Sequence, residues 1–137
     1  MEQDNLPKVV RVKDSSKEDV KSALKLGFST DPLVRWVFPD ANSYLKSFDL
    51  WMEEFSKISF SNDIVFADDN FYGASLWHPP GAKFDETSLA PTFDSIPKDR
   101  LENVIQFFEE FSNYHPEDAW YLAFIGVDPS KQGMGVG

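Results

Sequence analysis

The sequence predicts an α/β (α+β) fold in one domain, residues 1–137, with elements in the order β-α-α-β-β-α-β. Three segments repeat apolar residues every three or four positions, which is typical of helices with one buried face. Four short runs of apolar, aromatic and β-branched residues stand between turn-forming residues, as β-strands do. The chain has 137 residues, of which 42% are hydrophobic and 15% aromatic, so it is long and apolar enough to bury one core.

Local signals support each element in the first half of the chain. The predicted elements are a strand at 9–12, a helix at 16–27 and a second helix between 40 and 61. The strand is rich in β-branched residues. Ser16 and Asp19 have the spacing of a capping box at the start of the first helix, and Asp31 followed by Pro32 is predicted to end that segment. The second helix repeats large apolar side chains at helical spacing, so we expect it to be well buried.

The second half predicts a hairpin, a loop, a helix and a last strand. The predicted ranges are 64–67 and 71–77 for the hairpin strands, 81–97 for the loop, 101 to about 113 for the helix and 120–127 for the last strand. Asp68, Asp69 and Asn70 form the turn of the hairpin. The loop is polar and rich in proline, which predicts a surface position. The helix is amphipathic, and the pattern breaks at Pro116.

The last strand has no polar face. Strict alternation places Trp120, Leu122, Phe124 and Gly126 on one side and Tyr121, Ala123, Ile125 and Val127 on the other. Because both sides are apolar, we expect this strand to belong in the middle of a sheet.

A glycine-rich segment follows the last strand. It contains Gln132, Gly133, Met134, Gly135, Val136 and Gly137. Glycines at alternate positions leave backbone N–H groups accessible, so such a loop can surround an anion such as pyrophosphate. With Val127 and Pro129 before it, the segment resembles the acetyl-coenzyme A signature of the GNAT N-acetyltransferase superfamily. The Gln/Arg-x-x-Gly-x-Gly pattern of that family matches Gln132, Gly135 and Gly137.

Two upstream segments, Phe28 to Asp40 and Gly73 to Gly81, resemble the branch of that superfamily that includes puromycin N-acetyltransferase. The GNAT resemblance implies a mixed, mainly antiparallel sheet with helices on both faces. It also implies that the domain is truncated after the cofactor-binding strand, since a whole GNAT domain continues past this loop into further helices and strands.

The resemblance implies transfer of an acetyl group from acetyl-CoA to an amine of a small molecule or protein by direct attack. The residues that it implies for acetyl-CoA are Ile125, Gly126, Val127, Gln132, Gly133, Met134, Gly135, Val136 and Gly137. Backbone groups of Ile125 and Val127 would bond the pantetheine arm, and the Ile125 amide would polarise the thioester carbonyl. The amides of 132–137 would wrap the pyrophosphate. Without the helix that follows this loop in the family, we expect acetyl-CoA to bind weakly or not at all.

Two other interpretations stay open. Gly133 and Gly135 satisfy part of the Rossmann dinucleotide fingerprint, but a dinucleotide loop turns at the strand end, whereas residues 128–132 intervene here. The chain is alternatively a non-catalytic binding module that associates through its last strand. An unpaired apolar strand at a sheet edge invites a second chain to pair with it, so we expect a homo-oligomer.

No catalytic residue is assigned from the sequence. The last strand offers no carboxylate as a general base, and Tyr121, Glu117 and His115 near its start are more typical of caps or surface residues than of a proton relay. A lone histidine such as His78 is more often a hydrogen-bonded structural residue than a base. No His, Asp or Glu cluster has metal-ligand spacing, so we expect no metal.

Charge and composition narrow the expected partners. The chain has 13 basic and 23 acidic residues, a net charge of −10, which disfavours nucleic acids and anionic membranes. An acidic surface would favour a cationic amine and oppose the polyanion coenzyme A, but acidity that simply keeps a protein in solution is the commoner case. The absence of Cys excludes a disulfide scaffold and thiol catalysis. The first 14 residues contain no signal-peptide or membrane-spanning pattern, so we expect a cytoplasmic protein.

Overall fold

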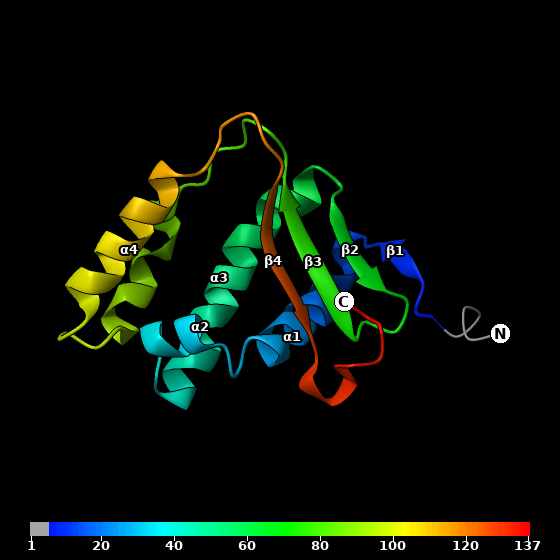
Figure 1. Ribbon diagram of the computed structural model, residues 1–137, viewed down its shortest axis with the longest axis horizontal. Coiled ribbons are helices and arrows are strands. Elements are labelled where there is room, and N and C mark those ends of the chain that lie inside the picture. The colour runs from blue at the N-terminus through cyan, green and yellow to red at the C-terminus, as the bar shows by residue number, and fades with distance from the viewer. Residues whose placement is uncertain (1–5) are drawn as a thin grey trace.

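The computed structural model describes residues 6–137, which contain one antiparallel sheet (Figure 1). Its strands lie in the order β1 (Val9–Arg11), β2 (Val65–Asp68), β3 (Gly73–His78) and β4 (Tyr121–Val127). Every neighbouring pair is antiparallel, which confirms the predicted hairpin, and the described residues contain no parallel pair of the predicted mixed sheet. Within residues 6–137, β4 pairs with β3 alone, so its other edge is open.

The helices largely follow the predicted order. They are α1 (Lys17–Gly27), α2 (Pro32–Val37), α3 (Ala41–Ser61) and α4 (Leu101–Asn113), with short 3-10 segments at Asp14–Ser16 (η2), Glu86–Ser95 (η3) and Pro129–Lys131 (η4). The long helices α1, α3 and α4 match three predicted segments. None of the helices among the described residues is both long and apolar enough to span a bilayer.

The short helix α2 was not predicted. The side chain of Asp31 accepts a hydrogen bond from the Val34 amide at 2.9 Å, and Pro32 occupies the first turn, where its missing N–H has no helical partner to lose. The two residues that were predicted to end a segment therefore start a helix. The predicted capping box at Ser16 is also wrong, because this residue ends η2 and its side chain makes no cap hydrogen bond.

The segment predicted as a surface loop, 81–97, is partly folded onto the core. It contains η3, in which Leu89 and Thr92 are buried. The indole N–H of Trp51 on α3 donates to the Thr92 hydroxyl at 3.0 Å. The sequence pattern concealed this packing because three hydrophobic residues in ten, Leu89, Ala90 and Phe93, are too few to show a helical period.

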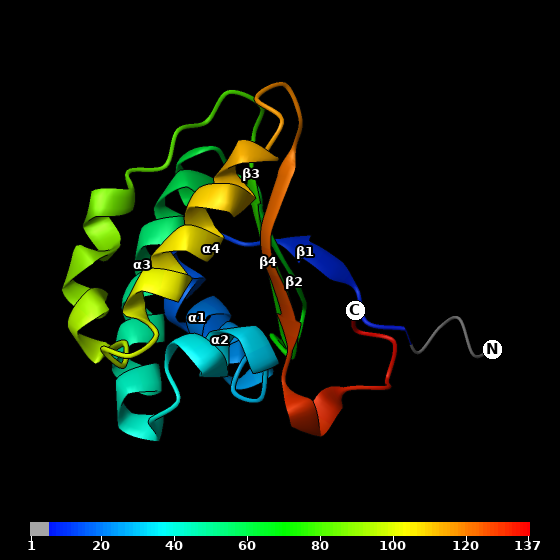
Figure 2. The ribbon, with the colours of Figure 1, turned by 60° about the vertical axis from the view of Figure 1, so that its left-hand side comes forward.

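The helices lie on one face of the sheet (Figure 2). Helix α1 contacts β3 and β4, and α3 contacts β2 and β3. On the opposite face, the side chains of Val136 and Val127 meet over Gly73, so the C-terminal segment covers one end of β3 and β4. Among residues 6–137, the helices that contact the sheet do so on one face, whereas the resemblance implied helices on both faces. The physical reason is that the apolar sides of α1 and α3 meet the same face, the one that presents Phe124.

Phe48 lies where α3, the end of α1 and β4 come together. Its side chain is fully buried. The centre of its ring lies 5.2 Å from that of Tyr44, 5.6 Å from that of Phe28 and 5.8 Å from that of Phe124. This aromatic cluster fixes the position of β4 relative to the helices.

A charged network joins α1 to α3. The ammonium group of the buried Lys21 lies 3.1 Å from Glu53 and 3.2 Å from Asp49, while Lys17 reaches Glu53 at 2.8 Å and Lys25 reaches Asp49 at 2.9 Å. The hydrogen bond from Lys17, together with Lys21, outweighs burial and lowers the pKa of Glu53. Burial raises the pKa of Asp49, but the bonds from Lys25 and Lys21 outweigh it and lower that pKa overall.

This network predicts acid sensitivity. A carboxylate with a lowered pKa in the folded state adds stability above its unfolded pKa, and that stability is lost as the pH falls through the folded pKa. The ordinary pKa of Glu53 is 4.5. Below that pH we expect the free energy of unfolding, measured in urea, to fall more steeply for the wild type than for Glu53→Gln. Parallel pH profiles of the two proteins would contradict this role for Glu53.

Candidate functional site

Strand β4 contains one irregularity opposite β3. Leu76 pairs with Phe124 and Trp77 pairs with Leu122, so Ala123 is the extra residue of a β-bulge. The bulge breaks the strict alternation of side chains that the sequence predicted for this strand. The residues before Ala123 are therefore shifted by one position relative to those after it, so the two groups no longer follow a single alternation of faces.

The ring contacts show the consequence of the bulge. Phe124 contacts Phe55 on α3, with 5.1 Å between ring centres, and Tyr121 contacts His78 at 5.8 Å, which itself stacks on Phe55 at 5.9 Å. Tyr121 and Phe124 therefore lie on the same, helix-covered face. The prediction that they point to opposite faces is wrong, because the bulge inserts one residue between them.

The backbone of Ile125 and Val127 faces the open edge of β4. Just beyond the ends of β4 and β3, the Asp128 amide donates to the Tyr72 carbonyl at 2.7 Å, so these two residues are a hydrogen-bonded pair of the ladder. In an antiparallel ladder, alternate residues pair with the neighbouring strand and the residues between them point away. Gly126 therefore pairs with β3, whereas the N–H and C=O groups of Ile125 and Val127 point outward. An extended molecule can pair with backbone groups that point outward from a strand in this way.

The two outward residues differ in accessibility. A Cβ added to Gly27 would lie 2.9 Å from the Val127 nitrogen and 3.1 Å from its oxygen, so the end of α1 already lies close to Val127. The side-chain amide of Gln132 also donates to the Val127 carbonyl at 3.2 Å. Ile125, whose side chain is exposed, is the more open of the two positions.

Gly126 has a packing role. A Cβ at this position would lie 3.2 Å from the ring of Phe28 and 3.4 Å from the side chain of Leu24. The absence of a side chain lets β4 lie close to α1. Of the residues that the sequence assigned to the cofactor, Gly126 thus holds the strand in place, while its neighbours present the backbone groups.

The glycine-rich loop follows η4 and turns back to the sheet. Gly133 and Gly135 have φ angles of 78° and 80°, a left-handed conformation that other residues adopt only with strain. Within residues 6–137, none of the amides of 133–137 donates a hydrogen bond. Met134 is exposed, and Val136 anchors the loop against Gly73. Unbonded amides in a loop with alternating left-handed residues are able to donate hydrogen bonds to an anion, and the predicted role of this loop stays a prediction.

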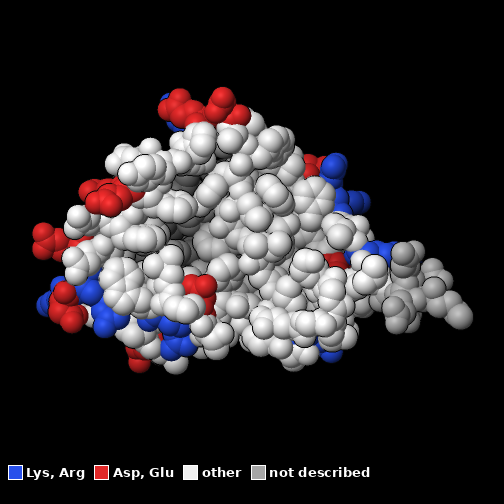
Figure 3. Space-filling model, in the orientation of Figure 1, with Lys and Arg blue, Asp and Glu red and all other residues white. Residues whose placement is uncertain are grey.

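Charge around the loop is sparse. The ammonium group of Lys131 lies over the ring of Tyr72, 4.6 Å from its centre, which places one cation beside the predicted pyrophosphate position. Figure 3 shows the face with the open edge as mainly uncharged around a hollow, with acidic and basic groups along the outer margin. The loop therefore has to hold an anion mainly through its amides.

At the opposite end of β4, His78 has a structural role. Its Nε2 lies 3.0 Å from the Phe55 carbonyl oxygen, so this nitrogen carries the proton and donates. Burial lowers the pKa of His78, against the opposing effect of that hydrogen bond. Burial also raises the pKa of the neighbouring Tyr121 hydroxyl. The interpretation of His78 as a hydrogen-bonded structural residue fits these contacts.

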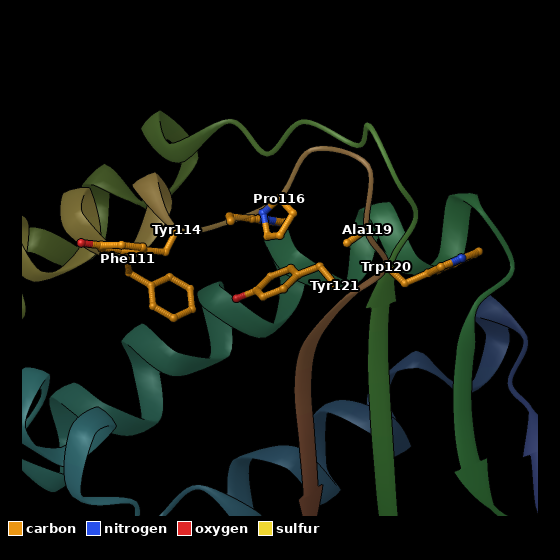
Figure 4. Close-up of a pocket in the computed structure, with 7 residues that line it drawn as sticks. Phe111, Tyr114, Pro116, Ala119, Trp120 and Tyr121 are labelled. Atoms are coloured by element: carbon orange, nitrogen blue, oxygen red, sulfur yellow. The ribbon is translucent and has the colours of Figure 1, made fainter.

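A pocket of about 150 Å³ lies between the end of α4 and the start of β4. In Figure 4 the rings of Phe111 and Tyr121 point toward each other, with Pro116 beside them, whereas Tyr114 and Trp120 point away. The sequence did not predict this pocket, because α4 and β4 meet only in the folded chain. The apolar character of both segments was its only signal.

The comparisons with known proteins identify the fold. A crystal structure from Corynebacterium glutamicum ATCC 13032, described as histone acetyltransferase HPA2 and related acetyltransferase, aligns with a TM-score of 0.62 and 18% sequence identity. The alignment covers 96% of this chain and 66% of the other, so this chain spans just under two thirds of that protein. The fold is GNAT-like. No protein-family model matched the sequence, and no curated protein matched it.

The GNAT-like fold agrees with the order of strands and helices predicted from the sequence. Ile125 and Val127 lie on the open edge of β4, whereas the glycine-rich loop that follows turns back over the sheet, where Val136 meets Gly73 and Gly135 lies near Leu6. The bulge at Ala123 and the pocket by Phe111 are the two features of this edge that sequence reasoning missed.

Proposed function

We propose that this protein belongs to the acetyl-CoA-dependent N-acetyltransferases and that the open edge of β4 binds acetyl-CoA. The observation that carries the proposal is the backbone of Ile125, which faces outward from the unpaired edge of β4, the strand that precedes the glycine-rich loop with the amides of 133–137. A peptide-like pantetheine arm can pair with such an edge as a further strand does. The acceptor is an amine of a small molecule or protein.

The residues of the edge have separate tasks. Acetyl-CoA supplies the activated acetyl group as a thioester. The Ile125 N–H donates to the thioester oxygen, the Val127 N–H bonds the arm, and the loop amides hold the pyrophosphate. As the neutral acceptor nitrogen attacks the thioester carbon, the C–N bond would form and the C–S bond would break. Coenzyme A would leave as its thiolate, which would take up the proton that the nitrogen loses. A well-aimed donor at the oxygen that gains negative charge contributes about 3 kcal/mol to lowering the barrier.

The proposal is tested by titrating acetyl-CoA into ¹⁵N-labelled protein. We expect saturable shifts of the amide signals of Ile125, Val127 and residues 133–137, while the β1–β2 pairing serves as an internal control that stays unchanged. With Lys131 beside the loop and a net charge of −10, we expect a dissociation constant weaker than micromolar. The proposal would be contradicted if the amide signals of Ile125, Val127 and residues 133–137 stayed unchanged at millimolar acetyl-CoA.

The open edge also favours a second candidate function. An unpaired strand with an exposed Ile125 can pair with the same strand of another copy, which makes the chain a binding module that forms a homo-oligomer. The same sample separates the two candidates. A light-scattering mass that rises with concentration, together with no response to acetyl-CoA, would favour the binding module.

A further inference from the structure

The pocket between α4 and β4 lies at the end of the open edge opposite to the glycine-rich loop. Phe111 contributes one wall from α4, and Tyr121 contributes the facing wall from the first residue of β4 (Figure 4). Along β4, the order is therefore pocket, bulge, outward Ile125 amide and glycine-rich loop. A molecule that approaches the acetyl group from the side away from the loop passes this pocket first.

The walls of the pocket suit a cation. The pocket is lined by the rings of Phe111 and Tyr121, and an aromatic ring attracts an ammonium group through the negative charge density of its π system. Glu117 and Asp118 are exposed in the connection that also supplies Pro116, so two carboxylates stand in the same loop as the pocket wall. The net charge of −10 acts in the same direction.

Two contacts fix the segment that carries Tyr121 and the loop before it. The Gly81 amide donates to the Glu117 carbonyl at 2.9 Å, which ties the loop after β3 to the loop before β4. The ring of His115 packs against that of Tyr121, with 4.5 Å between their centres. The wall that faces Phe111 is therefore positioned before any ligand arrives.

The distance along the strand separates this pocket from the reacting group. Tyr121 and Ile125 are four residues apart, which corresponds to roughly 13 Å in an extended strand, somewhat less across the bulge. The reacting nitrogen has to meet the thioester beside Ile125, so it cannot be the group that occupies the pocket.

We propose that this pocket binds a second cationic group of the acceptor, so that the acceptor is an elongated diamine. One ammonium group lies between Phe111 and Tyr121, and the other nitrogen, in its neutral form, reaches the acetyl group beside Ile125. The location of the reacting nitrogen rests on the function proposed above, whereas binding of a cation in the pocket does not.

The first experiment tests the pocket without acetyl-CoA. Butylamine, as its ammonium ion, and butanol are titrated separately while the ring signals of Phe111 and Tyr121 are followed by NMR. We expect the ammonium ion to bind about tenfold more tightly than the alcohol, and Phe111→Leu to abolish this preference. Phe93→Leu, at an exposed phenylalanine on η3 outside the pocket, is the matched control and retains it. Equal binding of amine and alcohol, or equal behaviour of the two variants, would overturn the proposal.

The second experiment measures acetyl transfer from acetyl-CoA to diaminoalkanes of increasing length and to amino alcohols of matching length. We expect an optimum length for the diamines, and a KM about tenfold lower than for the matching amino alcohol at similar kcat. Phe111→Leu should raise the diamine KM to that of the amino alcohol. A cation preference in the pocket without any transfer would refute the acetyltransferase function alone, while transfer that is insensitive to Phe111→Leu would refute the diamine assignment alone.

Discussion

Replacement of Ile125 by proline is expected to lower kcat for acetyl transfer about 10²- to 10³-fold, the loss that follows removal of one donor to a developing oxyanion. Proline lacks the N–H group that faces the open edge of β4, and an edge strand tolerates proline where its N–H points to solvent. The side chain of Ile125 is half exposed, at 50%, so the substitution removes little buried apolar surface.

Ile125→Val is the matched control for this substitution, because it trims the side chain and keeps the amide. We expect its kcat to stay close to that of the wild type. Circular dichroism and the thermal midpoint establish that both variants are folded. A folded Ile125→Pro protein with kcat within threefold of the wild type would assign the oxyanion donor to another group.

Phe48→Ala is expected to give the largest loss of stability, about 3–5 kcal/mol in the free energy of unfolding. The Phe48 side chain is fully buried and contacts rings from α1, α3 and β4. Its removal leaves a cavity that these three elements cannot all move to fill, since each is held by other contacts. A domain of this size typically has a total stability of about 5–15 kcal/mol, so the variant should be marginally folded at room temperature.

Leu45→Ala provides the control for Phe48→Ala. Leu45 lies on the same helix, α3, but is 54% exposed, so its truncation should change the free energy of unfolding by less than about 0.5 kcal/mol. Both values come from urea unfolding followed by circular dichroism. A loss below 1 kcal/mol for Phe48→Ala would show that this cluster does not position β4.

The elements that were predicted well are those with a strong local period. The amphipathic pattern of α3 and the turn residues between β2 and β3 act over short distances, so they are visible in the sequence. Local sequence signals gave the wrong prediction where the same residues can either end one helix or begin the next. Asp31 and Pro32 can end one helix or begin the next, and only the hydrogen bond to Val34 shows which occurs.

Some features of the candidate site were also predictable from the sequence, and others were not. The chemical nature of the glycine-rich loop was predictable, because left-handed positions such as Gly133 and Gly135 require a residue without a side chain. The orientation of the Ile125 amide was not, because it depends on the pairing register with β3, which a bulge at Ala123 shifts. A register is a relation between two strands and has no signature in either strand alone.

The sequence by itself determined the main helices and strands, the left-handed glycine positions of the loop after β4 and the resemblance to GNAT acetyltransferases. Local periodicity and backbone preferences act within a few residues, so the sequence carries them directly. The tertiary structure decided which edge of β4 stays open and which amides face that edge. It also brought Phe111 and Tyr121, which are ten residues apart in the sequence, together as lining residues of one pocket. These features arise from contacts between separate elements, which take a definite geometry only when the core around Phe48 closes.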